Sequence, residues 1–207
     1  MNLAAVVLAA GRGARFGGEK HAIQLAGKPL WQWSVDLFSG LGIPVTLVGS
    51  IPGGIPGGKR RRDSVVAGLN ALAPNVTHVL IHDAARPLAS QRLVERVVGA
   101  LEDGAKAVIP AVPVTDTIKR VADGSVVGTV DRSELWWVQT PQGFELRVLR
   151  EAHALHDDDV SDDASLVEAL GVTVRVVEGD QENRKITYRV DHFVAEATLS
   201  DFGDADA

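Results

Sequence analysis

A glycine-rich turn that leads into two cations is the first stretch whose residues are suited to chemistry. Gly11 and Gly13 follow an apolar run, and Arg15 and Lys20 come next along the chain. Glycines let the backbone approach a ligand closely and present amide hydrogens to phosphate oxygens. The stretch therefore favours a phosphate-binding loop with two fixed positive charges, although a structural turn with solvated charges would show the same residues.

The spacing in this turn differs from two common phosphate-binding motifs. A P-loop requires Gly-Lys-Ser/Thr after its spacer, and that triplet is absent here. A dinucleotide fingerprint requires a third glycine where Phe16 stands, and an acidic residue after the second strand, where Gly49 and Ser50 stand. Neither of these two site types fits the sequence.

An aspartate directly after an apolar run is the second candidate. Asp83 follows His78–Ile81 and His82. At the end of a buried strand, a carboxylate can share a hard cation such as Mg²⁺ with the phosphates of a nucleotide, but it can also cap a helix. If the chemistry is phosphoryl transfer to an existing phosphate, no general base is needed, and on that basis we expect His82 to be structural.

Three further charged stretches could bind a ligand or lie in solvent. Residues 59–62 (Lys-Arg-Arg-Arg) follow the glycine-rich residues 52–58 and indicate either a solvated patch or contact with a phosphate or nucleotide. The aspartates at 157–159, 162 and 163 lack the turn glycine and final glutamate of an EF-hand, so we expect a solvated face and a helix N-terminus. Lys185 follows the last expected strand, at the edge where ligands bind in α/β sheets.

Short apolar runs alternate with segments of helical period and would position these residues. The expected strands are Leu3–Ala9, Val45–Val48, His78–Ile81, Ala107–Pro110 and Val172–Val177, and the expected helices are Leu30–Leu41, Arg61–Leu72 and Ser90–Leu101. Strands that are apolar on both faces are typical of a parallel sheet covered by helices on both sides. We therefore expect an α/β sandwich, formed by one domain over residues 1–207.

The segment from Val112 to Thr140 breaks this alternation. Its short β-like pieces are separated by Asp123-Gly124 and Asp131-Arg132, which predicts an antiparallel arm inserted after a sheet strand. Trp136 and Trp137 are adjacent, so they should point to opposite faces of a strand. A thin arm cannot cover both side chains, and either the parent domain or a partner subunit must do so.

The composition limits the binding partners and the cellular compartment that we expect. A net charge of −6 and a pI near 5.5 argue against nucleic acid or an anionic membrane as the main partner. The absence of cysteine excludes disulfides and thiolate metal sites. The apolar opening, Leu3 to Ala10, is too short for a membrane span, and its nearest basic residues follow rather than precede it. We therefore expect a soluble cytoplasmic protein.

Taken together, these stretches resemble the 2-C-methyl-D-erythritol 4-phosphate cytidylyltransferase family of the non-mevalonate isoprenoid pathway. The resemblance spans nearly the whole chain, in the family's order of motifs: LAAGRGARF, RDSVVAGL, HDAARP, VPVTDTIK, TVDR, TPQGF, SDDAS and ENRKIT. It implies a Rossmann-like three-layer nucleotidyltransferase fold with a mostly parallel twisted sheet. It also implies an enzyme that joins CTP to methylerythritol phosphate, uses Mg²⁺ and releases pyrophosphate.

The resemblance assigns roles to particular residues. Arg15 and Lys20 would stabilise the α-phosphate in the transition state, while Arg132 and Lys185 would position the methylerythritol phosphate. Asp83 would bind Mg²⁺. The nucleotide-binding positions would be Ala9, Ala10, Gly11, Gly13, Gly58, Ser64 and Arg86, with Thr117 near the sugar phosphate. The family's arm exchanges with a second subunit, which implies a homodimer in which Arg132 serves the partner's site.

Some positions depart from the family's pattern. The loop between Arg15 and Lys20 is short, His21-Ala22 replaces a Gln-aromatic pair, and Lys59 stands where an acidic residue is common. These changes bear on CTP affinity but remove no residue assigned to catalysis. Two rival functions remain, namely a cytidylyltransferase for ribitol 5-phosphate on the same scaffold and a nucleotide sensor without turnover.

Overall fold

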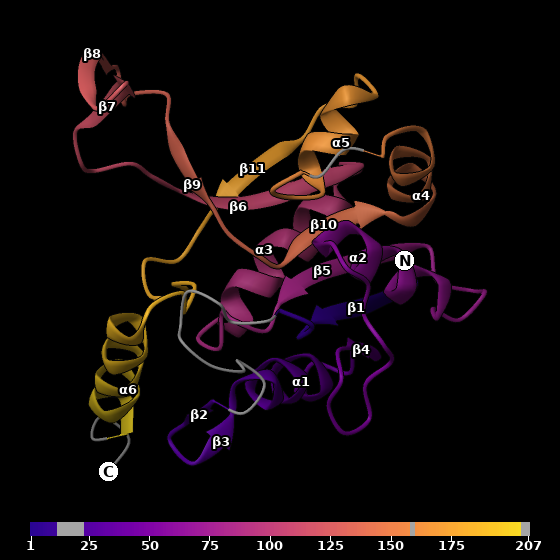
Figure 1. Ribbon diagram of the computed structural model, residues 1–207. Coiled ribbons are helices and arrows are strands. Elements are labelled where there is room, and N and C mark those ends of the chain that lie inside the picture. Colours follow the sequence, from indigo (N-terminus) through magenta and orange to yellow (C-terminus); the bar gives the residue numbers. More distant parts are fainter. Residues whose placement is uncertain (12–22, 158–159, 204–207) are drawn as a thin grey trace.

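A mostly parallel sheet forms the centre of the protein (Figure 1). The computed structural model describes residues 1–11, 23–157 and 160–203. The sheet strands are β1 (Leu3–Leu8), β4 (Val45–Val48), β5 (His78–Asp83), β6 (Ala107–Pro113), β9 (Trp136–Val138), β10 (Gln142–Glu145) and β11 (Arg175–Glu178). Their order is β11-β6-β10-β5-β1-β4, and β9 pairs with β6. β1 is parallel to β4 and β5, and β11 is parallel to β6, whereas β10 and β9 are antiparallel to their neighbours.

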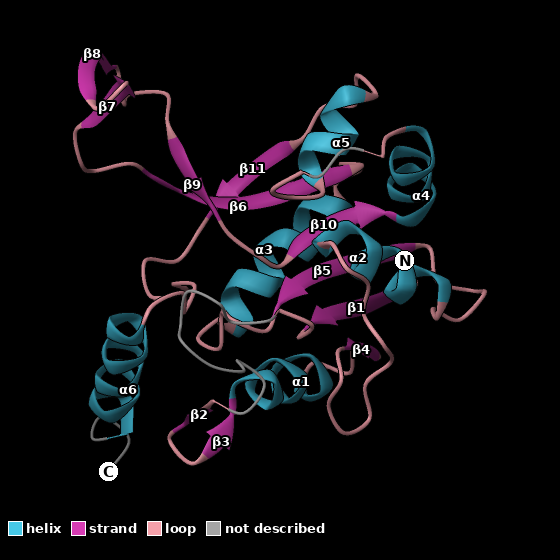
Figure 2. Cartoon of the chain, viewed as in Figure 1, coloured by secondary structure: helices cyan, strands magenta, loops and turns pink. Residues whose placement is uncertain are grey.

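Helices cover both faces of this sheet, as Figure 2 shows. One face carries α1 (Leu30–Gly40) and α3 (Gln91–Glu102), and the other carries α2 (Arg61–Asn70), α4 (Leu146–Leu155) and α5 (Ala164–Ala169). The strand residues alternate between the two apolar cores, with Val6 packed on the α2 side and Val7 on the α1 side. Burial on both faces explains the continuous apolar runs, and the expected three-layer α/β fold is confirmed.

The strand β10 is the main element that the sequence did not predict. It lies between β5 and β6, with Gly143 opposite both Leu80 and Val108. Gly143 is required by packing, because an added Cβ would lie 2.7 Å from a methyl carbon of Val97 on α3. The last sheet strand also starts later than expected, at Arg175, although Val172 and Val174 pack against the core.

The arm differs from the expectation at its base. β7 (Ile118–Ala122) and β8 (Ser125–Val130) form the antiparallel hairpin, and Figure 1 shows it standing away from the sheet. Its turn uses left-handed backbone at Asp123 and Gly124, as an Asp-Gly hairpin turn requires. β9 was expected within the arm, but it returns to the main sheet and places Trp137 opposite Val112.

The C-terminal helix, also not predicted, packs at the other end of the molecule. α6 (Arg189–Gly203) lies beside a small hairpin of β2 (Gln24–Leu25) and β3 (Lys28–Pro29). Leu25, Ile186 and Ala195 form a separate apolar cluster between them. None of the helices in the described part of the chain is long and apolar enough to cross a membrane.

Candidate active site

Asp83 and Lys185 meet at the carboxyl edge of the sheet. Asp83 ends β5, and its Oδ2 accepts a hydrogen bond of 2.6 Å from Lys185 Nζ. Its Oδ1 lies 3.4 Å from Arg61 Nε, and its backbone N–H donates to Thr140 Oγ1. Burial alone would raise the pKa of Asp83, but the charges of Arg61 and Lys185 outweigh burial and hold the pKa below its ordinary value. The site therefore presents an ionised carboxylate at the strand end where ligands bind.

Arg61 connects this carboxylate to a second one that is fully buried. Its Nη1 donates to Asp163 Oδ2 at 2.6 Å, and Asp163 Oδ1 lies 2.9 Å from His153 Nε2. Asp163 is 0% exposed, so the expectation of a solvated acidic face is wrong for this residue. The cap of α5 comes from Asp162, whose Oδ1 accepts from the backbone N–H of Ser165. The interpretation failed because sequence alone does not show that the start of α5 faces a cation on α2.

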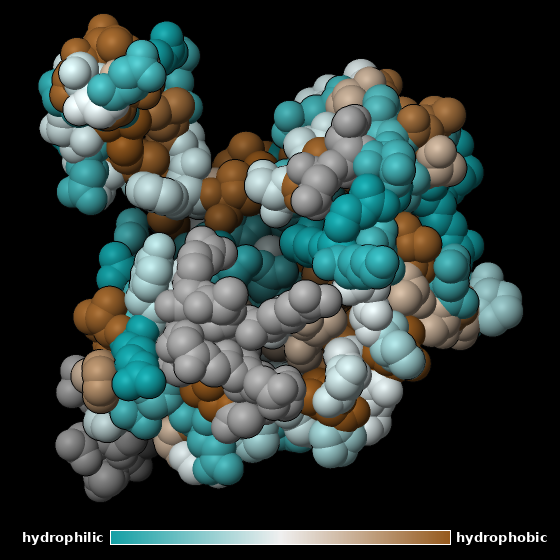
Figure 3. Space-filling view, viewed as in Figure 1, coloured by the Kyte–Doolittle hydropathy of each residue, from teal (hydrophilic) through white to brown (hydrophobic). Residues whose placement is uncertain are grey.

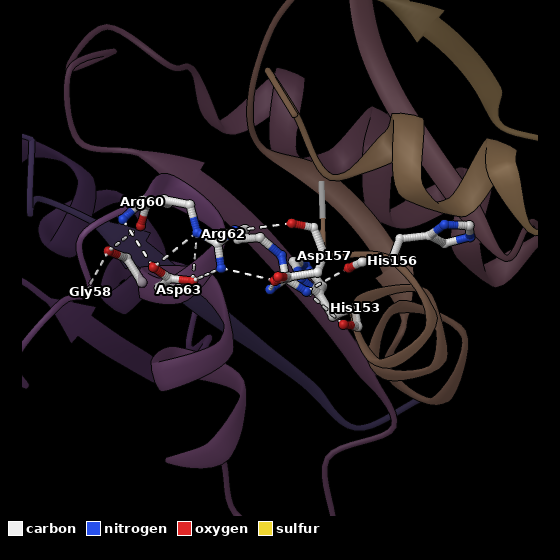
Figure 4. Close-up of polar contacts among 8 residues, drawn as sticks. Gly58, Arg60, Arg62, Asp63, His153, His156 and Asp157 are labelled. Carbon is white, nitrogen blue, oxygen red and sulfur yellow. Dashed lines mark hydrogen bonds and ion pairs between the residues drawn. The ribbon is translucent and has the colours of Figure 1, made fainter. Parts of the chain in front are cut away.

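The neighbouring arginines fix the start of α2 to the end of α4, as Figure 4 shows. Arg62 Nη1 lies 2.6 Å from Asp157 Oδ1, and its Nη2 donates to the backbone carbonyls of His153 and His156. Arg60 pairs with Asp63 and with the same Asp157 carboxylate. The basic run is therefore not a solvated patch, since carboxylates and carbonyls hold Arg60 to Arg62. Lys59 is its exposed member.

A tightly packed loop brings several predicted nucleotide-binding residues together. The backbone N–H of Gly58 donates to Ser64 Oγ at 3.0 Å, which ties the loop to α2. A Cβ on the preceding Gly57 would lie 2.5 Å from the Cβ of Ala10 and 2.9 Å from Ser64 Oγ. The loop thus lies directly against the end of β1, where a side chain on Gly57 would not fit.

Arg86 supports the segment that carries Lys185. Its Nη1 donates to the carbonyl of Asn183 at 2.7 Å, and its Nη2 donates to the carbonyl of Val138 at 3.1 Å. Burial lowers the pKa of Arg86, while the nearby charge of Asp83 acts in the opposite direction. Arg86 therefore joins the base of the arm to the Lys185 segment, in addition to the nucleotide contact predicted for it.

His82 is structural, as expected. Its ring is 0% exposed, and its Nδ1 lies 3.0 Å from Thr140 Oγ1. Burial lowers the pKa of His82 to about 4, so the ring is neutral at pH 7. Thr140 thus bonds both to His82 and to the backbone of Asp83, and it positions this strand end without having been predicted as a site residue.

The remaining predicted residues lie on the arm, directly after β1, or outside the described residues. Thr117 and Arg132 are exposed on the arm, and no hydrogen bond within the described part of the chain joins their side chains to Asp83 or Lys185. Ala9, Ala10 and Gly11 directly follow β1, and Ala10 lies against the loop described above. Gly13, Arg15 and Lys20 fall outside the described residues.

The donor set at Asp83 fits a cation that arrives with a nucleotide. The described residues contain no group of three or more His, Cys, Asp or Glu side chains that could hold a metal ion by itself. Magnesium in nucleotide enzymes is commonly bound by one or two carboxylates together with substrate phosphates and water. The carboxylate of Asp83 suits that mode of binding, in which the substrate completes the coordination shell.

Comparisons with known proteins show which family this chain belongs to. The family model described as 2-C-methyl-D-erythritol 4-phosphate cytidylyltransferase matches residues 3–201. Proteins of that name are similar to this chain: the one from Frankia casuarinae is 46% identical, over 99% of this chain and 84% of the relative, and the one from Streptomyces coelicolor is 40% identical, over 95% and 84%. The crystal structure of the enzyme of that name from Thermus thermophilus superposes with a TM-score of 0.83 at 36% identity, covering 97% of this chain and 100% of the other. The chain belongs to the 2-C-methyl-D-erythritol 4-phosphate cytidylyltransferase family.

Proposed function

We propose that this chain transfers the cytidylyl group of CTP to 2-C-methyl-D-erythritol 4-phosphate, giving 4-diphosphocytidyl-2-C-methyl-D-erythritol and pyrophosphate. Membership of the family over residues 3–201 supports the reaction. The structural observation that carries the proposal is the meeting of Asp83 and Lys185 at the carboxyl edge of the sheet. A carboxylate for a cation and a lysine for an anion stand there side by side, as a reaction between two phosphorylated substrates requires.

The chemistry needs alignment and charge neutralisation rather than a protein nucleophile. An oxygen of the acceptor's phosphate attacks the α-phosphorus of CTP in line, the new P–O bond forms, and pyrophosphate leaves with the electrons of the broken bond. The nucleophile is already anionic, so the barrier comes mainly from bringing two highly charged reactants together. Magnesium, when bound, would neutralise part of the charge on the nucleotide's phosphates, and Asp83 is the residue that we assign to hold it.

The protein's cations supply the remaining positive charge. We assign Arg15 and Lys20 to the α-phosphate, where charge develops in the transition state, and Lys185 and Arg132 to the acceptor's phosphate, with Thr117 nearby. For the nucleotide, we assign Ala9, Ala10, Gly11, Gly13, Gly58, Ser64 and Arg86. The packing of Gly57 and Gly58 against Ala10 and Ser64 supports this nucleotide-binding assignment, because backbone groups in a rigid loop can recognise the edge of a base.

We further propose that the active unit is a homodimer formed through the arm. Trp136 and Trp137 are 47% and 56% exposed, and the hairpin exposes Val121, Val126 and Val127. Figure 3 shows hydrophobic residues among polar ones on the visible surface of the projecting arm. Several large hydrophobic side chains exposed on one projecting element are typical of a protein interface. A second copy of the chain would cover it and would bring Arg132 to the partner's acceptor site.

Pyrophosphate release measured with matched substrate pairs tests the proposed reaction. CTP with methylerythritol phosphate should release pyrophosphate, whereas UTP, ATP and GTP should be poor donors. Release with ribitol 5-phosphate at a higher kcat/KM would replace the proposed acceptor. If CTP binds tightly but no pyrophosphate is released with either acceptor, the result would favour a nucleotide sensor. Equal turnover of CTP and UTP would contradict the assignment of the glycine-rich loop to cytosine.

A further inference from the structure

A line of polar side chains in hydrogen-bond contact runs from the core behind the site to Asp83. It begins at His153 on α4, passes through Asp163 at the start of α5, and reaches Arg61 at the start of α2. The contacts are 2.9 Å from His153 Nε2 to Asp163 Oδ1, and 2.6 Å from Arg61 Nη1 to Asp163 Oδ2. Arg61 Nε then faces Asp83 Oδ1 at 3.4 Å. Side chains from α4, from the start of α5 and from α2 are thus linked one after another to the carboxylate of Asp83.

Asp163 and His153, at the buried end of this line, are held more firmly than the contact between Arg61 and Asp83. The side chains of Asp163 and His153 are 0% and 4% exposed, so the buried carboxylate requires its two partners. Arg61 is partly buried, and its shorter contact is the one with Asp163 rather than the one with Asp83. A guanidinium group is planar, so fixing Nη1 on Asp163 also fixes the direction in which Nε points. The orientation of Arg61 is therefore determined from the core.

We propose that Arg61 is a positioning residue, anchored by Asp163 and His153, that holds the carboxylate of Asp83 in one orientation for an incoming divalent cation. This inference rests on the proposed role of Asp83 as the magnesium ligand. Groups that orient a metal-binding side chain commonly change metal affinity by about 10- to 100-fold when they are altered. Arg61 does not touch the reacting atoms in this scheme, because it acts through Asp83.

Two simpler roles for Arg61 make different predictions. If Arg61 only balanced the negative charge of Asp83, lysine would replace it, because lysine keeps the charge. If Arg61 only stabilised the fold, its loss would lower the melting temperature without changing the response to metal. A positioning role requires the fork geometry that arginine has and lysine lacks. The substitution Arg61→Lys therefore separates the three roles.

Arg62→Lys is the matched control. Arg62 is the next residue of α2, is buried, and contacts the carboxylate of Asp157 and the carbonyls of His153 and His156, but it does not contact Asp83. If a displacement of α4 relative to α2 changed the Mg²⁺ dependence of CTP binding, both lysine variants would therefore show the change. An effect through the orientation of Asp83 would appear only at Arg61.

The experiment measures equilibrium binding of CTP by calorimetry without acceptor, at graded concentrations of Mg²⁺, together with the melting temperature. Arg61→Lys should raise the Mg²⁺ concentration for half-maximal CTP binding by about tenfold. Asp163→Asn, which removes the anchor but leaves Arg61 in place, should raise it in the same direction and serves if Arg61→Lys does not fold. Arg62→Lys should lower the melting temperature and leave the Mg²⁺ dependence unchanged.

Asp83→Asn separates failure of this inference from failure of the proposed metal site. If Asp83→Asn raises the Mg²⁺ requirement while Arg61→Lys and Asp163→Asn do not, Asp83 keeps its role and the positioning role of Arg61 is overturned. If Asp83→Asn leaves the Mg²⁺ dependence unchanged, Asp83 is not the ligand and both proposals fail. An equal shift in Arg61→Lys and Arg62→Lys would assign the effect to the packing of α2 on α4, which also overturns the positioning role.

Discussion

Lys185 Nζ lies 2.6 Å from Asp83 Oδ2, so the lysine assigned to the acceptor's phosphate is paired with the carboxylate assigned to the metal. A divalent cation at Asp83 and a phosphate at Lys185 would each offer a more highly charged partner than this ion pair does. Binding of the two substrates therefore exchanges the partners of both side chains. Lys185 should consequently strengthen binding of the acceptor and weaken binding of the metal.

The substitution Lys185→Gln should raise the KM for methylerythritol phosphate and lower the Mg²⁺ concentration needed for CTP binding. The first effect follows from loss of a cation for the phosphate, and the second from removal of a competitor at Asp83. The ion pair is partly exposed, so the gain in metal affinity should not exceed about fivefold. Steady-state kinetics and calorimetric titration measure the two effects separately.

Lys106→Gln is the control for this prediction. Lys106 is also an exposed lysine, but it directly precedes β6, at the opposite end of the strand from the site. It should change neither quantity. An unchanged KM for the acceptor in Lys185→Gln would remove Lys185 from the acceptor site.

Replacement of Arg15 or Lys20 by alanine should lower kcat by about 10²- to 10³-fold and raise the KM for the acceptor far less. Each cation is assigned to charge that develops in the transition state, and losing one such contact commonly has an effect of this size. Lys28→Ala, which removes a lysine paired with Asp36, is the control and should retain activity. Near wild-type kcat in either variant would refute the role given to that residue.

The substitution Gly57→Ala should raise the KM for CTP at least tenfold, because the added methyl group meets Ala10 and Ser64 and pushes the loop away from β1. Gly99→Ala makes the same chemical change on α3, where a Cβ has no atom within 4 Å, and should leave kinetics unaltered. Initial-rate measurements at saturating acceptor compare the two. The same KM for CTP in both variants would show that the close packing of this loop does not matter for the nucleotide.

Mixing inactive Arg132→Ala and Lys20→Ala chains should restore activity if the sites are shared between subunits. A mixed dimer would have one site with both defects and one with neither, so random exchange should give activity at about one site in four. The specific activity of the mixture, compared with each variant alone, measures this recovery. Failure to recover activity, with subunit exchange demonstrated independently, would place all site residues on one chain. Light scattering that shows a monomer at the assay concentration would also rule out the shared site.

The strands and helices with strong periodic patterns could be predicted from the sequence, and the elements defined by tertiary contacts could not. Val45–Val48 and His78–Ile81 are short apolar runs, and both form sheet strands. Gln142–Glu145 contains one large apolar residue, Phe144, and becomes a strand because it fits between β5 and β6. The end of β6 extends to Pro113 for a similar reason, since β9 returns along it.

The site could be predicted where a residue ends a strand, but not where its role depends on a distant partner. Asp83 and Lys185 were recognisable because each follows a strand at the ligand-binding edge. Asp163 was misinterpreted because an acidic residue at the start of a helix is usually solvated, and its partner Arg61 lies 102 positions away in the sequence. The basic run offered no signal for separating Arg61, which faces Asp83, from Arg62, which faces α4.

The position of β10 also constrains the order in which the protein can fold during synthesis. β10 follows both β5 and β6 in the chain, and within the described residues it is the strand that connects them in the sheet. On a ribosome the two halves of the sheet therefore cannot close until Glu145 has emerged and the arm has turned back. Doubling the length of a flexible loop adds only about 0.6 kcal/mol to its closure. The arm should thus tolerate changes in length, whereas a substitution that breaks β10 would divide the sheet in two.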